Sequence, residues 1–317
     1  MRRFALLLAL TVIVSACSET VRDVGRPSVS PHASAVPSAP VSPNPAASVS
    51  PVATPTTAPT PSGPRFDPCP GNPRCTLVLN AIDQLNPYRM DADLNALTGF
   101  VSRDVRHPGH AKAQAYIKEQ LGGLAYHGWK IESQRTVYQG IPLENIFAIL
   151  DPSSGSQPAT GWVLVSAHYD SVANRTPGWR PAIDPAPGAD DNATGTAALL
   201  EFARALSLWR EAGNLRSRIV LAFFDGEELY FKGSGAYMAT LPKPYPYKAA
   251  INLDMVGFNP ITDRLDLLWY TNASAGLRDR VIKVNQTYRI GVSPLNAQFA
   301  ADGTTIMDAA QIGRAHV

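Results

Sequence analysis

Three short, largely apolar segments constrain the fold of this 317-residue chain more than its other features do. Trp162–Ala167, Ile219–Phe224 and Ile251–Met255 are largely apolar, and helical patterns separate them along the chain. Apolar runs that lack alternating polar residues are typical of strands buried on both faces. Strands that alternate with helices predict an α/β fold, and we expect a three-layer sandwich with a mostly parallel central sheet.

The rest of the folded part is expected to add four helices and two earlier strands. Apolar residues spaced for one face predict helices, and the Gly122–Gly123 pair predicts the end of the first. Ligands bind such sheets beyond the carboxyl ends of the strands, so a site is expected there. The expected helices are His110–Leu121, Thr196–Trp209, Ser234–Leu241 and Leu277–Tyr288, and the earlier strands are Lys130–Tyr138 and Asn145–Leu150.

Residues 1–17 have the pattern of an export signal. Arg2 and Arg3 precede the apolar run Phe4–Ala16, which is too short to span a bilayer as a helix of the mature protein. Small residues stand directly before Cys17, as in a bacterial lipobox, where the cysteine is lipidated after cleavage. We expect an exported protein, lipid-anchored at the cell surface or secreted, with an ordinary secretory signal as the alternative.

Residues 18–64 have the composition of a linker. The stretch Pro27–Pro64 contains no Asp, Glu, Lys or Arg and consists mostly of Pro, Ser, Ala, Thr and Val. Such a segment cannot bury enough apolar surface to offset the entropy of ordering it, and its prolines favour extended polyproline II geometry. We therefore expect a disordered, semi-rigid spacer in front of a folded domain over residues 65–311.

Two cysteines, Cys69 and Cys75, remain after Cys17. They flank a loop rich in Pro, Gly and Asn, and an exported protein reaches an oxidising environment. A disulfide between them is therefore favoured over free thiols. A zinc site at this pair is disfavoured, because no second Cys/His pair follows it.

Ionisable residues follow each predicted strand. His168–Ser171, Asp225–Glu228 and Leu253–Met255 stand at the strand ends, and Gly188–Gly195, which contains the pair Asp190–Asp191, leads into a helix. Taken alone, the Asp pair is explained by a helix N-cap, the Glu pair by a solvated helix start and the histidine by a core position. Together they bring an imidazole and several carboxylates to one sheet edge, where burial without a cation is costly. Mixed His and carboxylate ligands are typical of zinc, so a metal site is predicted.

These four segments, in this order and spacing, resemble the motifs of one family of zinc exopeptidases. It is the family of bacterial leucyl aminopeptidase, aminopeptidase Y and glutamate carboxypeptidase II. The similarity extends from about Leu94 to Ala310 and includes the early segment Arg106–His110. The resemblance implies the phosphorylase/hydrolase-like sandwich of these exopeptidases and two co-catalytic Zn²⁺ ions.

Carried over position by position, the resemblance implies a set of metal ligands. His168 and Asp254 would bind one zinc ion and Glu228 the other. Asp191, the second residue of its Asp pair, would bridge the two ions.

The resemblance also implies two residues that act on the reaction without binding metal. Asp170 would accept a hydrogen bond from the far nitrogen of His168 and so orient the ring. Glu227 would be the general base that takes a proton from the attacking water.

The last part of the sequence departs from the family pattern. The family's second zinc site also takes a late histidine, but the only histidine after Asp254 is His316, which comes too soon. Ala301–Gly303 stands where Ser-Asp-His is frequent in the family. Residues 312–317 match the translation of a widely used sequencing adapter, and we interpret them as a non-native tail on a domain whose C-terminal end is missing. Activity of the chain as it stands is then in doubt; a natural single-metal variant is the alternative.

The predicted function is that of a metal-dependent aminopeptidase, with unblocked peptide or protein N-termini as substrates. A glutaminyl cyclase-like acyltransferase with one zinc ion and a non-catalytic binding domain on a stalk are the alternatives. A formal net charge of +2, without a run of Lys and Arg, disfavours nucleic acid as a partner. Contact with a membrane is expected only through a lipid on Cys17.

Overall fold

The computed structural model describes residues 71, 73–152, 161–211, 213, 215–243, 245–258, 264–269 and 274–298. The predicted signal (1–17), linker (18–64) and tail (312–317) lie outside these residues, as do Cys69 and Ala301–Gly303. Among the described helices, none combines the length and the apolar character that a membrane span requires.

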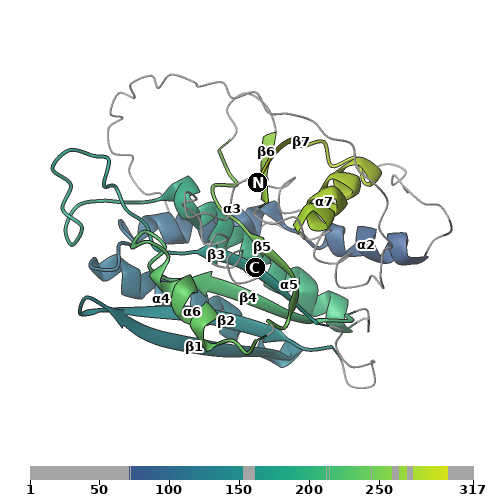
Figure 1. Ribbon diagram of the computed structural model, residues 1–317, viewed down its shortest axis with the longest axis horizontal. Coiled ribbons are helices and arrows are strands. Elements are labelled where there is room, and N and C mark those ends of the chain that lie inside the picture. Colours follow the sequence, from purple (N-terminus) through teal and green to yellow (C-terminus); the bar gives the residue numbers. More distant parts are fainter. Residues whose placement is uncertain are drawn as a thin grey trace.

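A five-stranded sheet in the order β1-β2-β4-β3-β5 forms the centre of the domain (Figure 1). In it, β4 (Arg218–Phe224), β3 (Trp162–His168) and β5 (Tyr247–Asn252) are parallel neighbours. By contrast, β2 (Ile141–Leu150) is antiparallel to both β4 and β1 (Trp129–Tyr138). The predicted α/β class is confirmed, but the sheet is mixed, and its parallel pairs join the three strands that were expected to carry the site.

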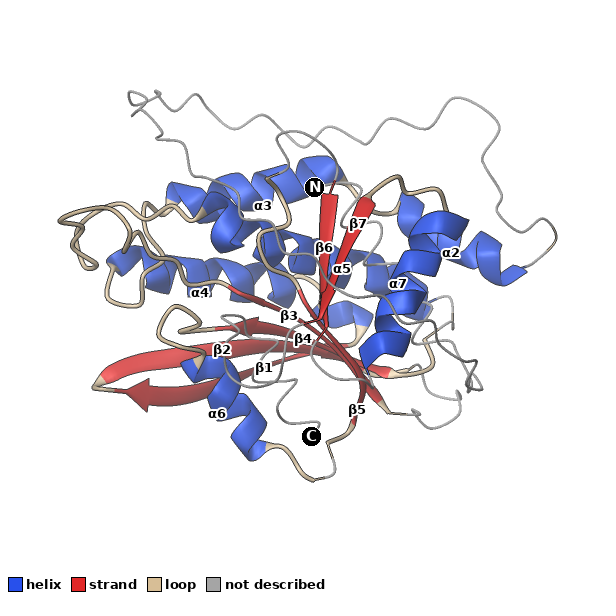
Figure 2. Ribbon diagram, turned by 45° about the horizontal axis from the view of Figure 1, so that its top comes forward, coloured by secondary structure: helices blue, strands red, loops and turns tan. Residues whose placement is uncertain are grey.

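Helices pack on both faces of this sheet (Figure 2). The larger core lies between the sheet and α3, α4 and α5, whose bounds are Pro87–Gly99, Pro108–Gly122 and Gly195–Glu211. The smaller core lies beneath α6 (Lys232–Thr240). In β4, Ile219 and Leu221 face the larger core, whereas Val220 and Ala222 face the smaller one. Because both faces are covered, β3 and β4 carry no polar alternation and are recognisable as continuous apolar runs.

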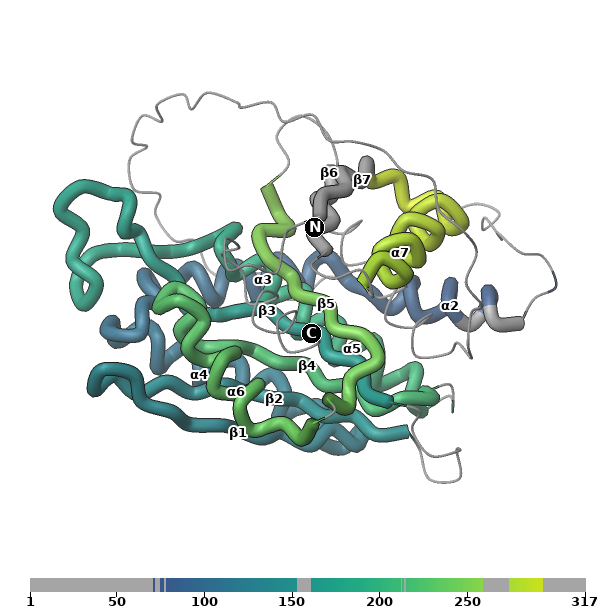
Figure 3. Tube along the Cα trace, in the orientation of Figure 1, coloured from purple at the N-terminus to yellow at the C-terminus, as the bar shows by residue number. Residues whose placement is uncertain are grey.

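A second, smaller unit lies beside the first helix of the domain. It consists of the parallel strands β6 (Arg264–Trp269) and β7 (Ser293–Gln298), with α7 (Ala275–Thr287) between them. Figure 3 shows α7 next to α2 (Pro73–Asp83). Cys75 of α2 is disulfide-bonded, and the Tyr288 hydroxyl donates to its sulfur at 3.7 Å. Since Cys69 is not among the described residues, the predicted Cys69–Cys75 pairing stays a prediction.

The four predicted helices are present as α4, α5, α6 and α7, with ends shifted by a few residues. Three predicted strand boundaries are wrong by several residues. The strand predicted from Asn145 begins at Ile141, because Gln139 and Gly140 both have positive φ (50° and 81°) and close a tight hairpin. The strand predicted over Ile251–Met255 begins at Tyr247 and ends at Asn252, and Met255 has a φ of 50° that a strand does not accommodate.

The parallel register brings three chain segments to one edge of the sheet. His168, the last residue of β3, pairs with Phe224, the last residue of β4. Just beyond β5, the Leu253 N–H donates to the Ser166 carbonyl oxygen at 2.8 Å. The segments that follow β3, β4 and β5 therefore leave the sheet side by side.

The start of α6 presses against the end of β4, and this contact can be tested with a pair of glycines. A Cβ on Gly233 would lie 2.0 Å from the Asp225 carbonyl oxygen and 2.4 Å from Asn145 Oδ1. Gly233→Ala is therefore expected to lower the free energy of unfolding by about 1–3 kcal/mol. Gly235 of the same helix has nothing within 4 Å of such a Cβ, so Gly235→Ala is expected to raise it by up to about 1 kcal/mol. Urea unfolding measures both; equal effects would contradict the close packing at Gly233.

Candidate functional site

His168 ends β3 with its side chain almost fully buried, at 1% exposure. Its Nε2 faces Asp191 Oδ1 at 3.1 Å and Asp254 Oδ1 at 3.5 Å. Its Nδ1 lies 3.3 Å from Asp170 Oδ1 and 3.2 Å from the Asp170 carbonyl oxygen. The structure thus brings three of the predicted site residues to the two nitrogens of one imidazole.

Asp170 also ties His168 to the loop after β4. Its Oδ1 accepts the backbone N–H of Glu227 at 3.2 Å, and its Oδ2 accepts that of Glu228 at 3.1 Å. A buried carboxylate held by two N–H groups has few other orientations available. Asp170 therefore fixes both glutamates relative to the imidazole, a contact that sequence reasoning did not foresee.

The two neighbouring aspartates before α5 face different partners. Asp190 Oδ1 accepts the backbone N–H groups of Gly257 at 2.7 Å and Phe258 at 3.1 Å, so it holds the segment that follows β5. Asp191, in a non-helical conformation (φ −102°, ψ 94°), points to His168 instead, with its side chain 48% exposed. The irregular turn between Gly188 and α5 thus separates a structural aspartate from a site aspartate.

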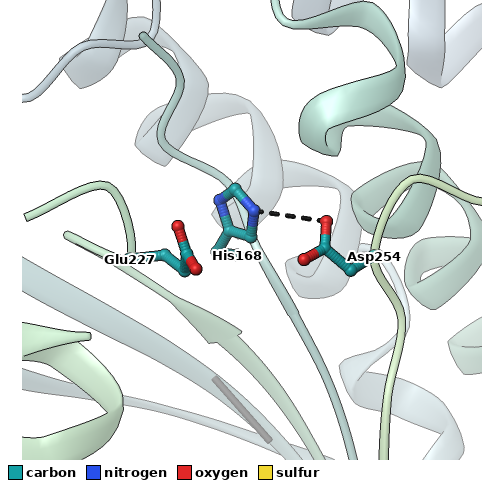
Figure 4. A group of neighbouring side chains, drawn as sticks. All are labelled: His168, Glu227 and Asp254. Carbon is teal, nitrogen blue, oxygen red and sulfur yellow. Dashed lines mark ion pairs between the residues drawn. The ribbon is translucent and has the colours of Figure 1, made fainter. Parts of the chain in front are cut away.

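The two glutamates of the loop after β4 also differ. Glu227 is buried, and with His168 and Asp254 it forms a group whose potential ligand atoms all lie within 4.8 Å of one another (Figure 4). Glu228 is half-buried and lies outside that group. Burial, followed by the charges of neighbouring carboxylates, raises the pKa of Glu228 to about 8. The most compact group therefore includes the residue predicted as general base and not Glu228, the residue predicted as a ligand.

The donor set fits a divalent cation. His168 Nε2 and Asp254 Oδ1 are buried, and neither has a hydrogen-bond partner of acceptable geometry in the described part of the chain, although the two atoms are 3.5 Å apart. Buried polar atoms almost always have such a partner. Carboxylates gathered around one imidazole also disfavour one another's ionised form. A cation would satisfy the two atoms and relieve the repulsion, and imidazole with carboxylate oxygens suits zinc.

A buried cluster of polar residues binds the start of the loop after β4. His110 Nε2 lies 2.8 Å from Asp225 Oδ1, and Asp225 Oδ2 accepts the Glu144 N–H at 2.8 Å. Burial alone would lower the pKa of His110, but the hydrogen bond and charge of Asp225 raise it above its ordinary value. The His110 ring stacks on Tyr169, whose hydroxyl donates to the Glu144 carbonyl oxygen at 2.8 Å. Sequence reasoning gave this cluster no role, although His110 and Asp225 both fall in motifs that it singled out.

Comparison with known proteins gives the family context. The profile described as Peptidase family M28 matches residues 145–308, just over half of the chain. The chain is 31% identical over 191 residues to the Escherichia coli protein named Uncharacterized protein YfbL, which covers 57% of this chain and 54% of that protein. It is 29% identical over 193 residues to Leucine aminopeptidase 1 of Coccidioides posadasii, with 58% and 46% covered. The chain thus spans about half the length of these relatives.

Solved structures with the same fold come from two kinds of enzyme. The Legionella pneumophila LapA aminopeptidase has a TM-score of 0.59 at 15% identity, covering 74% of this chain and 58% of that one. The Porphyromonas gingivalis glutaminyl cyclase has a TM-score of 0.57 at 22% identity, covering 74% and 81%. At these identities the likeness establishes the fold and does not decide between the two activities.

The aspartate pair offers a matched test of the metal site. Asp191→Ala is expected to lower the zinc content, because it removes a carboxylate that faces His168. Asp190→Ala removes the acceptor of two backbone N–H groups and is expected to cost about 1–3 kcal/mol of stability while keeping the zinc. Elemental analysis and thermal unfolding of both variants measure this. If only Asp190→Ala lost zinc, Asp190 and not Asp191 would be the residue of the metal site.

The metal-free protein is expected to lose thermal stability as the pH rises from about 5 to about 8. In this window Glu228, with a folded pKa of about 8, keeps its proton in the folded state and loses it in the unfolded state. His168 acts in the same direction: burial lowers its pKa, but the contacts with Asp170, Asp191 and Asp254 raise it well above its ordinary value. The folded state thus binds more protons than the unfolded state. Thermal unfolding at several pH values measures how stability changes with pH. Glu228→Gln is expected to reduce this dependence. Stability that rises from pH 5 to pH 8 would contradict the raised pKa values of Glu228 and His168.

Proposed function

The chain belongs to peptidase family M28, and on this premise we propose that it is a zinc-dependent aminopeptidase. Its substrates would be peptides with an unblocked N-terminus, of which it hydrolyses the first peptide bond. The observation that carries the proposal is the compact group of buried His168, buried Glu227 and partly buried Asp254 at the edge of the parallel strands. The similarity to Leucine aminopeptidase 1 supports the release of the N-terminal residue.

Two zinc ions are proposed, one held by His168 and Asp254 and one by Glu228, with Asp191 shared between them. When bound, the zinc ions would polarise the scissile carbonyl and lower the pKa of the attacking water. His168 Nε2 and Asp254 Oδ1 support the first position, because neither makes a hydrogen bond of acceptable geometry in the described part of the chain. The second position is proposed because Glu228 lies half-buried near other carboxylates, where a cation would relieve their repulsion and favour the ionised carboxylate.

Glu227 is proposed as the general base. It is buried, its backbone N–H is fixed by Asp170, and its carboxylate belongs to the compact group with His168 and Asp254. Glu227 would take one proton from the attacking water as the water oxygen bonds to the carbonyl carbon. It would then give that proton to the departing amine as the C–N bond breaks, which releases a carboxylic acid and an amine and restores Glu227; the acid then ionises by passing its remaining proton to the amine or to solvent.

The proposal includes a place of action outside the cytoplasm. Its support is the residue pattern of the first 64 positions, an export signal ending at Cys17 followed by a spacer without charged residues from Pro27. The folded domain over residues 65–311, a three-layer sandwich in its complete form, would then be displayed on this spacer.

A panel of aminoacyl-p-nitroanilides tests the activity. Purified protein is expected to release p-nitroaniline, to lose this activity in a chelator and to regain it with zinc. N-acetylated counterparts are expected to stay intact, because the substrate amine is blocked; their cleavage would contradict an aminopeptidase. Cyclisation of an N-terminal glutamine by protein with about one zinc per chain would favour the glutaminyl cyclase activity of its structural neighbours.

The same assay tests the two glutamates against each other. Glu227→Gln is expected to keep its zinc and to lose roughly 10²-fold or more in kcat, since an amide cannot accept the proton. Glu228→Gln is the matched variant and is expected to lose zinc from one position. If Glu227→Gln keeps a kcat near that of the unsubstituted protein, Glu227 is not the general base. If Glu227→Gln loses zinc, Glu227 is a metal ligand.

A further inference from the structure

Arg103 is a fully buried cation whose side-chain hydrogen bonds all go to backbone carbonyls in the described part of the chain. Nε donates to the Tyr169 carbonyl oxygen at 2.7 Å, and Nη2 to that of Gly188 at 2.9 Å. Nη1 donates to the carbonyl oxygens of Pro187 at 2.5 Å and Leu97 at 3.4 Å. A buried guanidinium is costly unless its donors are used, and all three nitrogens are used here.

The carbonyls that bind Arg103 belong to the two segments that carry the candidate ligands. Tyr169 stands between His168 and Asp170, and Gly188 directly precedes the turn with Asp191. A long loop, residues 171–187, separates these two segments along the chain. Arg103 therefore joins both ends of this loop, and with them the histidine and the aspartate that face each other.

The backbone around Arg103 reinforces the same junction. The Arg103 N–H donates to Ser171 Oγ at 3.0 Å, and that hydroxyl donates to the Ala186 carbonyl oxygen at 2.7 Å. Gly188 has a φ of 48°, and a Cβ there would lie 2.5 Å from Ser171 Cβ and 3.0 Å from Arg103 Nη2. The loop base is thus packed around the guanidinium without room for another side chain.

The charge of Arg103 acts on the same residues. Burial lowers its pKa to about 10, and the neighbouring carboxylates of Asp170, Asp191 and Glu228 act in the opposite direction. Arg103 is therefore protonated at neutral pH, and its charge offsets part of the repulsion among these carboxylates. Lysine could keep the charge but not the planar fork that reaches several carbonyls at once.

We propose that Arg103 is a positioning residue of the zinc site, which sets the separation of His168 and Asp191 through its fork of hydrogen bonds to Tyr169, Pro187 and Gly188. The inference rests on the proposed metal site and not on the identity of the substrate. It concerns the preformed geometry of the ligands, so it is tested by metal binding in the absence of any peptide.

Arg204, which is partly buried, provides a control for the effect of losing an arginine that joins parts of the domain. Its Nη1 pairs with Asp93 Oδ2 at 2.6 Å, and Nη2 donates to Gln120 Oε1 at 2.9 Å. These bonds join α5 to α3 and α4 and involve no candidate ligand. Arg204→Met should therefore lower stability without moving the ligands.

The zinc affinity of Arg103→Lys, Arg103→Met and Arg204→Met is measured by competition with a chromophoric chelator, with circular dichroism to confirm folding. Both Arg103 variants are expected to bind zinc about 10–100-fold more weakly, as when a group that orients a ligand is lost. Arg204→Met is expected to keep the affinity within about twofold while its unfolding temperature falls. Arg103→Lys, the milder change, serves if Arg103→Met does not fold.

Three results would overturn the inference or its premise. Unchanged zinc affinity in Arg103→Lys would show that the fork does not position the ligands. An equal loss of zinc affinity in Arg204→Met would show that general loosening of the domain causes the effect. If the protein without substitutions binds no zinc, the proposed metal site itself is wrong. The experiment thereby separates failure of the metal site from failure of the Arg103 inference.

Discussion

The parallel pairing of β3 with β4 and β5 is the constraint on which the other features of the domain depend. Parallel neighbours need crossover connections, and α5 and α6 supply them. These helices cover opposite faces of the sheet, so the strands must be apolar throughout. Polar residues are then confined to the strand ends, and the register of His168 with Phe224 places those ends together. The same pairing that requires an apolar core thus concentrates the ionisable groups at one edge.

Placing these ionisable groups close together has an electrostatic cost, and the surrounding residues stabilise some of the groups more than others. Asp170 is stabilised by the N–H groups of two glutamates, and Asp190 by those of two residues beyond β5. Arg103 adds a buried positive charge nearby. Among the described residues, the buried polar atoms without a hydrogen-bond partner include His168 Nε2 and Asp254 Oδ1, together with Asn252 Nδ2 and Trp209 Nε1, and the half-buried carboxyl of Glu228 has a raised pKa. His168 Nε2 and Asp254 Oδ1 belong to proposed metal ligands, and a bound cation would supply the partner that these two atoms lack.

The sequence predicted the α/β class and the edge at which the site lies, because apolar runs followed directly by His, Asp and Glu are local features. It did not predict β2 from Ile141 or helix α3, although Asn86 and Pro87 gave a cap signal for α3. It also could not show that Asp190 binds the chain beyond β5. That role depends on contacts 67 and 68 positions away, and no periodicity encodes such a pairing. Long-range polar contacts of this kind were the part that needed the structure.

Two supports of the candidate site come from a different part of the chain than its proposed ligands. His168, Asp191, Glu228 and Asp254 all fall within the family match at residues 145–308. Arg103 and His110, which hold the ligand segments from behind, precede that match, and they belong to the segment that links α3 to α4 and to α4 itself. Residues 145–308 alone would carry the ligands without the guanidinium that joins the ends of the 171–187 loop. They would also lack the imidazole that pairs with Asp225. The candidate site therefore includes contacts from α4 and from the segment between α3 and α4, in addition to residues within the family match.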